Sequence, residues 1–535
     1  MNIAAMLCDR ARQLGEAAAL IDRRKGKDRE VSFRALETIT ARVAGEITSQ
    51  GIRQGDGVLI LHPMAIELYV FLIALFRVGA VGMFLDPSAG RKYIDRCMGI
   101  YSPRAFFGSW KAQILRLWTP SMRRIEISFC TSRIPATHFI SLDGEAKLVQ
   151  AIADVEDSAP ALITFTSGST GQPKAALRTH GFLLAQQDAL QSSLSLRPGD
   201  NDLTTLPIFV LSNLASGVTS VLPDADMRTP GKIDARPVLN QIERHSVAST
   251  AASPAFFRRL ADECARTNKR IPQLKRVFMG GAPVFPRDLR QARKLFPNAE
   301  ITAVYGSTEA EPMADVHLSQ IAEEDLLAME RGAGLLAGIP VASIALRIVR
   351  DQWGKHLEPM TELQFDALCL PPEAVGEIVV SGKHVLPGYL NGAGDFETKF
   401  DVDGVRWHRT GDLGLLDSQG RLWLMGRASA AIHDRHGDLY PFAAECAAMQ
   451  VEGVRRAAIL QVAGLRVLAV EADREDVSDS LRRSMAWAHL DEIRLLDSIP
   501  MDKRHNAKID YGALTKALSK PNWNLSISPS RKRER

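Results

Sequence analysis

An apolar run that stops abruptly in a loop of small residues constrains this chain more than any other stretch. Residues 161–165 are predicted to form a buried strand, and Thr166-Ser-Gly-Ser-Thr-Gly171 follows directly. Two glycines among four hydroxyl residues let backbone N–H groups and hydroxyls come close to phosphate oxygens. Lys174 adds a positive charge, and a helix is expected over Leu177–Leu194. The pattern predicts a phosphate-binding turn; a flexible surface loop is the simpler alternative.

The alternation of strand and helix begins well before this loop. Strands are expected at residues 57–62 and 80–85, with a helix over 65–77 between them. A strand, a helix and a strand at this spacing imply a parallel sheet. A further helix is expected over Arg91–Ile100. The predicted fold class is therefore α/β.

Two later strands also end in glycine turns. The strand at 274–279 runs into Gly280-Gly-Ala-Pro283, and the strand at 300–305 runs into Gly306-Ser-Thr-Glu309. Between them, Pro286–Leu295 is expected to be a helix. Ligands of open α/β sheets bind beyond the carboxyl ends of the strands. We therefore expect these turns and the first loop to converge on one ligand.

The local pattern divides the chain into a large and a small domain. Residues 1–426 are predicted to form a large N-terminal domain of parallel-rich α/β subdomains. Within it, short alternating strands at about 335–426 indicate a small β-rich subdomain. Residues 427–518 are expected to form a compact, mobile α+β C-terminal domain. Residues 519–535 end in Arg531-Lys-Arg-Glu-Arg535 and are expected to be a disordered basic tail.

Charge, apolar runs and cysteines limit the possible partners. The net charge of +4 over 535 residues gives no reason to expect nucleic acid. The longest apolar stretch, 68–76, is broken by Arg77 and falls short of the ~20 residues of a transmembrane helix. The N-terminus shows no secretion signal. The six cysteines lack zinc or redox spacing, which predicts a reducing, cytoplasmic location.

Five motifs, in order, resemble those of the adenylate-forming superfamily, which includes acyl-CoA synthetases, luciferases and the adenylation domains of peptide synthetases. The phosphate loop matches 166–174, and the adenine and magnesium motif matches 304–310. Residues 409–412 match the family's ribose-binding motif, and Gly426-Arg427 matches the start of its hinge. Residues 500–508 match its catalytic-lysine motif. The resemblance covers most of the chain. It implies a large domain, a mobile small domain and an AMP-dependent ligase.

The same resemblance implies ATP and Mg²⁺ as cofactors and assigns roles to individual residues. Thr308 would contact the α-phosphate, and Glu309 would bind Mg²⁺, which prefers oxygen ligands. Lys508 would bridge the substrate carboxylate and the α-phosphate, offsetting charge as pyrophosphate leaves. The remaining ATP-binding residues that it implies are Thr166, Ser167, Gly168, Ser169, Thr170, Gly171, Lys174, Gly281, Ala282, Pro283, Tyr305, Gly306, Ser307, Asp412 and Arg427.

Finer motifs resemble one branch, the olefin β-lactone synthetases and related fatty acyl-CoA ligase-like bacterial proteins. They are Ser253–Leu260, Gly280–Pro286, Arg504–Lys508 and Asp438–Pro441 with Glu445. Leu206–Asn213 also lacks the His that many acyl-CoA synthetases carry, with Val210 in its place. The implied substrate is a hydrophobic carboxylic acid, fatty or β-hydroxy. Its adenylate would be captured by its own hydroxyl to give a β-lactone, or by CoA, the thiol of an acyl carrier protein, or an amine. Ser429 and Ala430 replace the usual charged hinge residue, which leaves the use of CoA open.

The acyl pocket is expected around Phe209, Val210, Phe256 and Glu311. Glu311 is unusual beside an apolar site. It either faces the pocket, where it would meet a hydroxyl or amine of the substrate, or it faces solvent. Acyl carrier proteins and pathway enzymes are the expected protein partners.

Two alternative functions, neither of them enzymatic, compete with the interpretation as an enzyme. A non-catalytic nucleotide- or acyl-binding protein of the same fold would be expected to lack Lys508, Glu309 or Lys174, and all three are present. A membrane-associated interaction protein would rest only on the basic tail and the apolar stretch near Leu68. An adenylate-forming enzyme is therefore the favoured interpretation.

Overall fold

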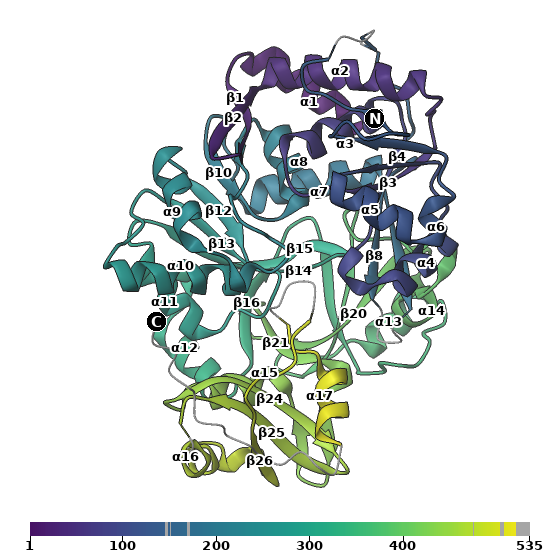
Figure 1. The fold of residues 1–535 in the computed structure, drawn as a ribbon. Helices are drawn as coiled ribbons and strands as arrows, with labels where there is room; N and C mark the ends of the chain where they lie inside the picture. The colour runs from purple at the N-terminus through teal and green to yellow at the C-terminus, as the bar shows by residue number, and fades with distance from the viewer. Residues whose placement is uncertain (145–147, 150, 168–171, 475, 503–507, 520–535) are drawn as a thin grey trace.

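Two large sheets build the chain up to Arg427 in the computed structural model (Figure 1). The structure describes residues 1–144, 148–149, 151–167, 172–474, 476–502 and 508–519. The predicted basic tail lies outside these residues, apart from Ser519. The α/β fold class is confirmed, with a small C-terminal unit below the large domain in Figure 1.

The first sheet has the strand order β7-β6-β5-β3-β4-β8-β9. All its neighbouring strands are parallel except β8 and β9, which form an antiparallel pair. The strands are β3 (Gly57–Leu61), β4 (Val81–Phe84), β5 (Ala105–Gly108), β6 (Ile127–Cys130), β7 (His138–Phe139), β8 (Pro160–Ser167) and β9 (Pro173–Thr179).

Helix α3 (Ile66–Arg77) packs against both this sheet and helix α2 (Phe33–Ser49). All twelve residues of α3 are buried, which explains why its sequence is apolar nearly all round. Ser32 caps α2 by accepting a hydrogen bond from the Ala35 amide. The predicted helix over Arg91–Ile100 is present with these bounds as α4.

One expectation for this sheet is wrong. The residues after the glycine loop do not enter a helix at Leu177; they first form β9, which returns antiparallel to β8 with Lys174 opposite Thr166. Burial on both faces holds β9 in the sheet, since the consecutive residues Ala175 and Ala176 both lie in the core. The helix begins only at α7 (His180–Ser193), where Thr179 accepts a hydrogen bond from the Phe182 amide.

The second sheet joins a parallel half to an antiparallel half. Its order is β17-β18-β20-β21-β16-β15-β14-β13-β12-β10-β11-β1-β2, with β19 paired to β20. The strands are β1 (Ala18–Arg24), β2 (Lys27–Ser32), β10 (Asn201–Thr204), β11 (Thr219–Val221), β12 (Ser249–Ala252), β13 (Arg276–Met279), β14 (Glu300–Ser307), β15 (Ala310–His317), β16 (Leu335–Pro340), β17 (Ala345–Val349), β18 (Gly376–Ser381), β19 (Lys399–Val402), β20 (Val405–Leu416) and β21 (Leu422–Arg427).

The other helices of the large domain connect these strands. They are α1 (Ile3–Leu14), α5 (Trp110–Trp118), α6 (Pro120–Arg123), α8 (Pro207–Ser216), α9 (Ala235–Arg244), α10 (Pro254–Thr267), α11 (Pro286–Leu295), α12 (Glu323–Glu330), α13 (Glu362–Leu368) and α14 (Asp395–Thr398). Among the described residues, no helix is both long and apolar enough to cross a membrane.

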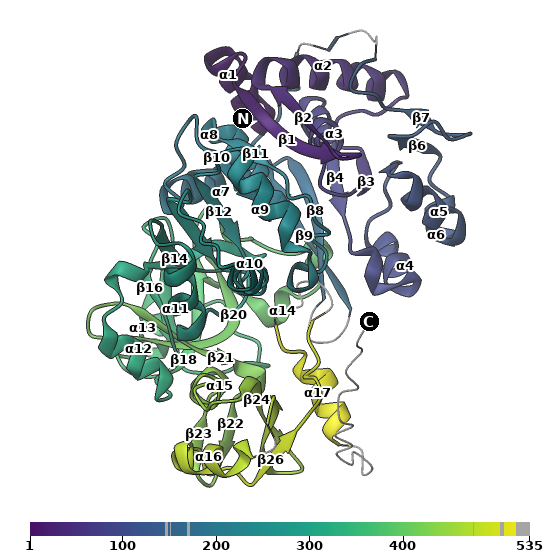
Figure 2. The same ribbon diagram turned by 60° about the vertical axis from the view of Figure 1, so that its left-hand side comes forward.

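A small unit follows β21 and has its own core. Strand β25 pairs antiparallel with β24 and parallel with β26, and α15 packs against β24. Figure 2 shows this unit beneath the large domain. Its elements are β22 (Ile432–Asp434), β23 (Gly437–Leu439), α15 (Pro441–Ala448), β24 (Val454–Val462), β25 (Leu465–Ala472), α16 (Val477–Ser484), β26 (Glu492–Leu495) and α17 (Tyr511–Leu518).

A buried ion pair fixes β20 against β18. The Arg409 guanidinium donates to both oxygens of Glu377, and the two side chains are 1% and 0% exposed. Arg409→Met should lower the free energy of unfolding in urea by about 3–5 kcal/mol, because it leaves the Glu377 carboxylate buried without its partner.

The matched control is Arg406→Met. Arg406 lies on the same strand, β20, and pairs with Asp401 of β19, but its side chain is 39% exposed. Its removal should cost less than about 1 kcal/mol. Equal losses for the two variants would contradict this description of β20.

Candidate active site

Two residues from distant motifs, Tyr305 and Arg427, donate hydrogen bonds to the Asp412 carboxylate. The Tyr305 hydroxyl, near the end of β14, donates to Asp412 Oδ2 at 2.8 Å. The Arg427 guanidinium donates to the other oxygen at 3.0 Å and to the Thr410 carbonyl oxygen at 2.9 Å. Asp412 and Arg427 stand opposite each other where β20 and β21 pair. The predicted adenine and ribose residues therefore lie together.

The glycine turn after β13 lies beside the same strand end. Strands β13 and β14 are parallel, with Met279 opposite Ala303. Gly280 is so close to β14 that a Cβ atom there would lie 2.8 Å from the Val304 carbonyl oxygen. Gly281 has a φ of +73°, a conformation that favours glycine. The partly exposed residues Gly281, Ala282 and Pro283 thus border the surface next to Tyr305.

Glu309 lies in the turn between β14 and β15, within a set of buried polar side chains. Its Oε1 accepts a hydrogen bond of 2.7 Å from the Tyr389 hydroxyl, and its amide donates to Ser307 Oγ at 3.2 Å. Burial acts to raise the pKa of Glu309, but the Tyr389 hydrogen bond and the nearby Lys399 act against it. The net pKa lies below the ordinary value, so Glu309 is an anion at neutral pH.

Two basic side chains are buried near Glu309. Lys399, 2% exposed, donates to the Leu386 carbonyl oxygen, and its Nζ lies 5.8 Å from the centre of the Tyr389 ring. Burial lowers the pKa of Lys399 to about 7, although Glu309 and Asp395 act to raise it. Burial likewise lowers the pKa of His408 to about 3, so this ring is neutral. Lys399 and His408 therefore add little positive charge beside Glu309 at alkaline pH.

The ends of the phosphate-loop motif reach the same region. Lys174 Nζ lies 5.5 Å from the centre of the Tyr389 ring and 3.4 Å from Glu397 Oε2. Thr166 stands opposite Lys174 in the β8–β9 pair, and Ser167 is the last residue of β8. Gly168, Ser169, Thr170 and Gly171 lie outside the described residues. The ring of Tyr389 thus lies near Lys174, while its hydroxyl binds Glu309.

Lys508 approaches from the small domain. It is exposed, and its amide donates to Asp502 Oδ1 at 2.9 Å, next to an antiparallel bridge between Met501 and Ile509. Glu311 lies on β15 of the large domain, and the positive charge of Lys508 acts on its carboxyl group. Burial raises the pKa of Glu311 to about 7, and the positive charges of Arg178 and Lys508 act to lower it. The two domains therefore bring Lys508 toward Glu311.

Glu311 is not a solvent-facing residue. It is half-buried, its side chain packs near Gly306, and its carboxylate accepts no hydrogen bond within the described parts of the chain. Nearby, Arg178 donates to the carbonyl oxygen of Thr308 at 2.9 Å. Such a carboxylate can accept a hydrogen bond from a ligand without first losing one from the protein.

The apolar residues expected in the acyl pocket are all buried. Phe209 and Val210 lie on α8 but in different core clusters; Phe209 packs with Phe278 and Val304 beside the end of β14. Phe256 on α10 is fully buried in the core around β12 and β13. Their role as pocket residues remains a prediction.

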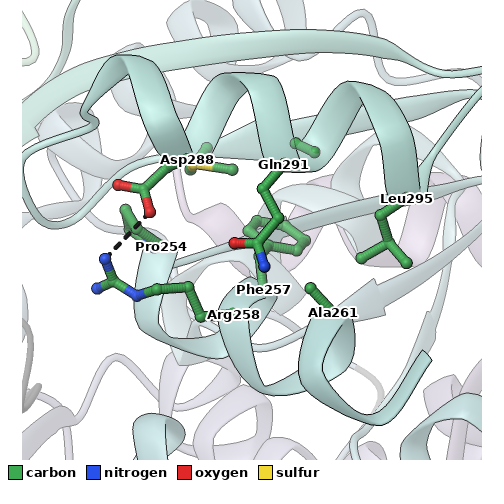
Figure 3. Close-up of a pocket in the computed structure, with 9 residues that line it drawn as sticks. Pro254, Phe257, Arg258, Ala261, Asp288, Gln291 and Leu295 are labelled. Atoms are coloured by element: carbon green, nitrogen blue, oxygen red, sulfur yellow. Dashed lines mark hydrogen bonds and ion pairs between the residues drawn. The ribbon is translucent and has the colours of Figure 1, made fainter. Parts of the chain in front are cut away.

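A small cavity between α10 and α11 is separate from these groups (Figure 3). The Arg258–Asp288 ion pair, at 3.0 Å, spans one end of it, and Phe257 and Leu295 line it. Its volume of about 10 Å³ has room for a single water molecule at most. We therefore assign it no ligand.

Several side chains at the site were not predicted from the sequence. Tyr389, Lys399, His408 and Arg178 surround the motif residues, and Trp353 stacks near Arg427, 6.0 Å from ring centre to guanidinium carbon. Of these residues, only His408 could have been predicted from the sequence, because it directly precedes the Arg409–Asp412 motif. The others lie in segments without a recognisable pattern.

Comparison with known proteins agrees with this geometry. The family model described as "AMP-binding enzyme" matches residues 7–390. The chain belongs to the AMP-binding enzyme family. It is 32% identical to the olefin β-lactone synthetase of Stenotrophomonas maltophilia, over 95% of this chain and 96% of that protein. It is 27% identical to the 2-succinylbenzoate–CoA ligase of Bacillus subtilis, over 85% and 84%.

Solved structures share the fold at lower identity. The O-succinylbenzoate coenzyme A synthetase of Bacillus subtilis in complex with ATP and magnesium gives a TM-score of 0.77 at 22% identity, covering 96% of this chain and 99% of that one. The amide bond synthetase of Marinactinospora thermotolerans gives 0.77 at 21%, covering 96% and 99%. These structures show the fold that the chain shares with them, and the family match with the similarity to olefin β-lactone synthetases makes the chain an adenylate-forming enzyme.

Replacing the buried lysine of this AMP-binding enzyme should change how its stability depends on pH. Unfolded Lys399 keeps its proton up to about pH 10.4, whereas the folded protein releases it near pH 7. The unfolded state thus binds more protons between these values, so Lys399 makes stability rise with pH there.

The free energy of unfolding in urea should be measured at pH 7.5 and 9 for the wild type and Lys399→Met. Between these pH values the difference should move in favour of the wild type, by up to about 1.4 kcal/mol per pH unit. A difference that stays constant over this window would mean that Lys399 keeps its proton in the fold.

Proposed function

We propose that the protein uses ATP to activate a hydrophobic carboxylic acid as an acyl-adenylate, with release of pyrophosphate. The observation that carries this proposal is that Tyr305 and Arg427 both bind the Asp412 carboxylate, while Lys508 comes from the small domain. In this arrangement a nucleotide can be held by the large domain while a cation from the other domain reaches its phosphates.

The nucleotide would lie along the strand ends. Asp412 would accept hydrogen bonds from the ribose hydroxyls, and Arg427 would contact the same sugar. Tyr305, with the turn from Gly281 to Pro283, would flank the adenine. Lys174 and the hydroxyls of Thr166 and Ser167 would bind the β- and γ-phosphates, with Gly168–Gly171 supplying further backbone donors.

Glu309 would hold Mg²⁺ through its carboxylate. Among the described residues there is no cluster of three metal-binding side chains, and a single carboxylate plus phosphate oxygens is the usual donor set of Mg²⁺ in such sites. The ion supplies charge stabilisation for the leaving pyrophosphate. The low pKa of Glu309 and its Tyr389 hydrogen bond suit this role, because they keep the carboxylate ionised and oriented.

Lys508 would bind the substrate carboxylate and the α-phosphate together, beside Thr308. One carboxylate oxygen attacks the α-phosphorus, and the bond to pyrophosphate breaks. Positioning two anions against one cation lowers the repulsion between them in the transition state. We propose residues 427–518 as the mobile domain that carries Lys508 in and out.

For the second step we favour intramolecular capture, in which the β-hydroxyl oxygen attacks the acyl carbon and AMP leaves. The similarity to olefin β-lactone synthetases over nearly the whole chain supports this choice. The half-buried Glu311, which accepts no hydrogen bond from the described residues, suits recognition of a substrate hydroxyl. CoA, a carrier-protein thiol or an amine are the alternative acceptors, and an acyl carrier protein is then the partner.

The proposed compartment is the cytoplasm. All six cysteines lie in described residues and all are free thiols, buried or half-buried. Scattered reduced thiols are typical of proteins from a reducing compartment.

The activity is tested by incubating the protein with ATP, Mg²⁺ and a panel of plain and β-hydroxy fatty acids, with and without CoA, and identifying products by mass. Pyrophosphate release and a CoA-independent product lighter than the β-hydroxy acid by one water are expected. An acyl-CoA product would replace lactonisation by thioester formation. No pyrophosphate with any acid would contradict the proposed adenylation.

Glu311→Leu extends the same assay. The substitution removes the acceptor for the substrate hydroxyl, so the preference for β-hydroxy over plain acids should fall by about tenfold, the loss expected for one hydrogen bond to a charged group. Glu311→Gln, which retains an acceptor oxygen, should lose less. An unchanged preference in Glu311→Leu would exclude Glu311 from substrate recognition.

A further inference from the structure

Helix α5 (Trp110–Trp118) turns its large apolar side chains toward solvent. Trp110, Ile114, Leu117 and Trp118 are 52%, 48%, 62% and 69% exposed. Their spacing of four, three and one residues places them on one stripe of the helix. Four large apolar residues gathered on one exposed stripe are a sign of an interaction surface, whereas scattered single residues are not.

The buried face of α5 shows that this orientation is built into the fold. It consists of Ala112 and Gln113, which are 9% and 5% exposed. The Gln113 amide donates to the Phe129 carbonyl oxygen at 3.0 Å, and its oxygen accepts from Ser128 at 3.1 Å. These bonds attach α5 to β6 through a polar residue. The helix is therefore held with its apolar stripe outward.

Basic residues surround the stripe. Residues 91–124 contain eight Lys and Arg against one Asp, a net charge of +7, whereas the whole chain has a net charge of +4. Helix α6 (Pro120–Arg123) packs against both α4 and α5, and Arg91 of α4 donates to the Trp118 carbonyl oxygen at 3.4 Å. Figures 1 and 2 both place α4, α5 and α6 together at one outer edge of the large domain.

Most of these cations are not neutralised by the protein. Six of them are exposed and form no ion pair in the described residues of the chain: Arg91, Lys92, Arg96, Lys111, Arg123 and Arg124. Elsewhere on the surface, arginines commonly pair with carboxylates, as Arg228 does with Asp226 and Arg236 with Asp234. The edge thus combines exposed tryptophans with positive charges that form no ion pair in the described residues.

We propose that this edge docks the enzyme on an anionic lipid surface. Tryptophan, leucine and isoleucine enter the boundary between head groups and acyl chains, and Lys and Arg around them meet the negative head groups. A protein partner buried on the same stripe would not by itself require a ring of unpaired cations. Docking would hold the enzyme where hydrophobic acids partition, but the inference does not depend on which acid it activates.

The test is co-flotation of the full-length protein with vesicles of phosphatidylcholine alone or with 30% phosphatidylglycerol. The wild type should float with the anionic vesicles, less at high salt, and remain in solution with neutral ones. Leu117→Ser/Trp118→Ser and Arg91→Glu/Lys92→Glu should each weaken binding by at least about tenfold, since each changes two of the contacting groups.

Matched variants separate docking from general changes in surface character. Leu363 on α13 and Phe396 on α14 are similarly exposed, 81% and 65%, but lie on other helices. The variant Leu363→Ser/Phe396→Ser should therefore bind vesicles like the wild type. Arg482→Glu/Arg483→Glu on α16 repeats the charge change away from the edge and should also leave binding unchanged.

Three results would overturn the proposal. They are no flotation with anionic vesicles, equal losses in the α5 and control variants, and a dimer in sedimentation that Leu117→Ser/Trp118→Ser dissociates. Quenching of tryptophan fluorescence by brominated acyl chains gives a second readout. It should be strong in the wild type and mostly lost in Trp110→Phe/Trp118→Phe.

Discussion

The Asp412 carboxylate is the contact on which the site depends. It joins the end of the parallel half of the second sheet, through Tyr305, to the last residue of the antiparallel half, Arg427. The chain enters the small domain directly after Arg427. A change in the hinge therefore acts on a residue that already touches the centre of the site. In the proposed function, this contact would couple the nucleotide site to movement of the small domain.

A second set of buried polar groups stands behind Glu309. Tyr389 donates to Glu309 and lies against the ammonium groups of Lys174 and Lys399. One aromatic side chain therefore connects the phosphate-loop lysine to the proposed metal ligand. Burying polar groups raises the free energy of the folded state unless each group has a hydrogen-bond or charge partner. Here the partners come from four different segments of the chain.

The sequence predicted the parts of the fold that depend on local patterns. Helices α4 and α11 have the predicted bounds, because Gly90 and Pro286 mark where they begin and the apolar period shows how far each continues. Strand β9 was missed, since Ala175 to Thr179 is strand only because it pairs with β8 across the loop. Propensity alone does not report such long-range pairing.

The motif residues of the site were predictable, but their surroundings were not. Asp412 and Tyr305 were found because each stands in a recognisable motif. Tyr389 and Lys399 lie in spacer sequence, and only tertiary packing brings them to Glu309. The exposed stripe of α5 was missed for a related reason: the sequence shows that a helix has apolar residues but not which face the sheet covers.

The central claim is that large-domain groups bind the nucleotide while Lys508 of the small domain drives adenylation. It is tested most directly by measuring ATP affinity and acid-dependent ATP–pyrophosphate exchange in Lys508→Ala, with Lys516→Ala on α17 as the exposed control. The account predicts near-normal ATP binding and exchange reduced by at least about a hundredfold in Lys508→Ala, with neither changed in Lys516→Ala. Near-normal exchange in Lys508→Ala would contradict it.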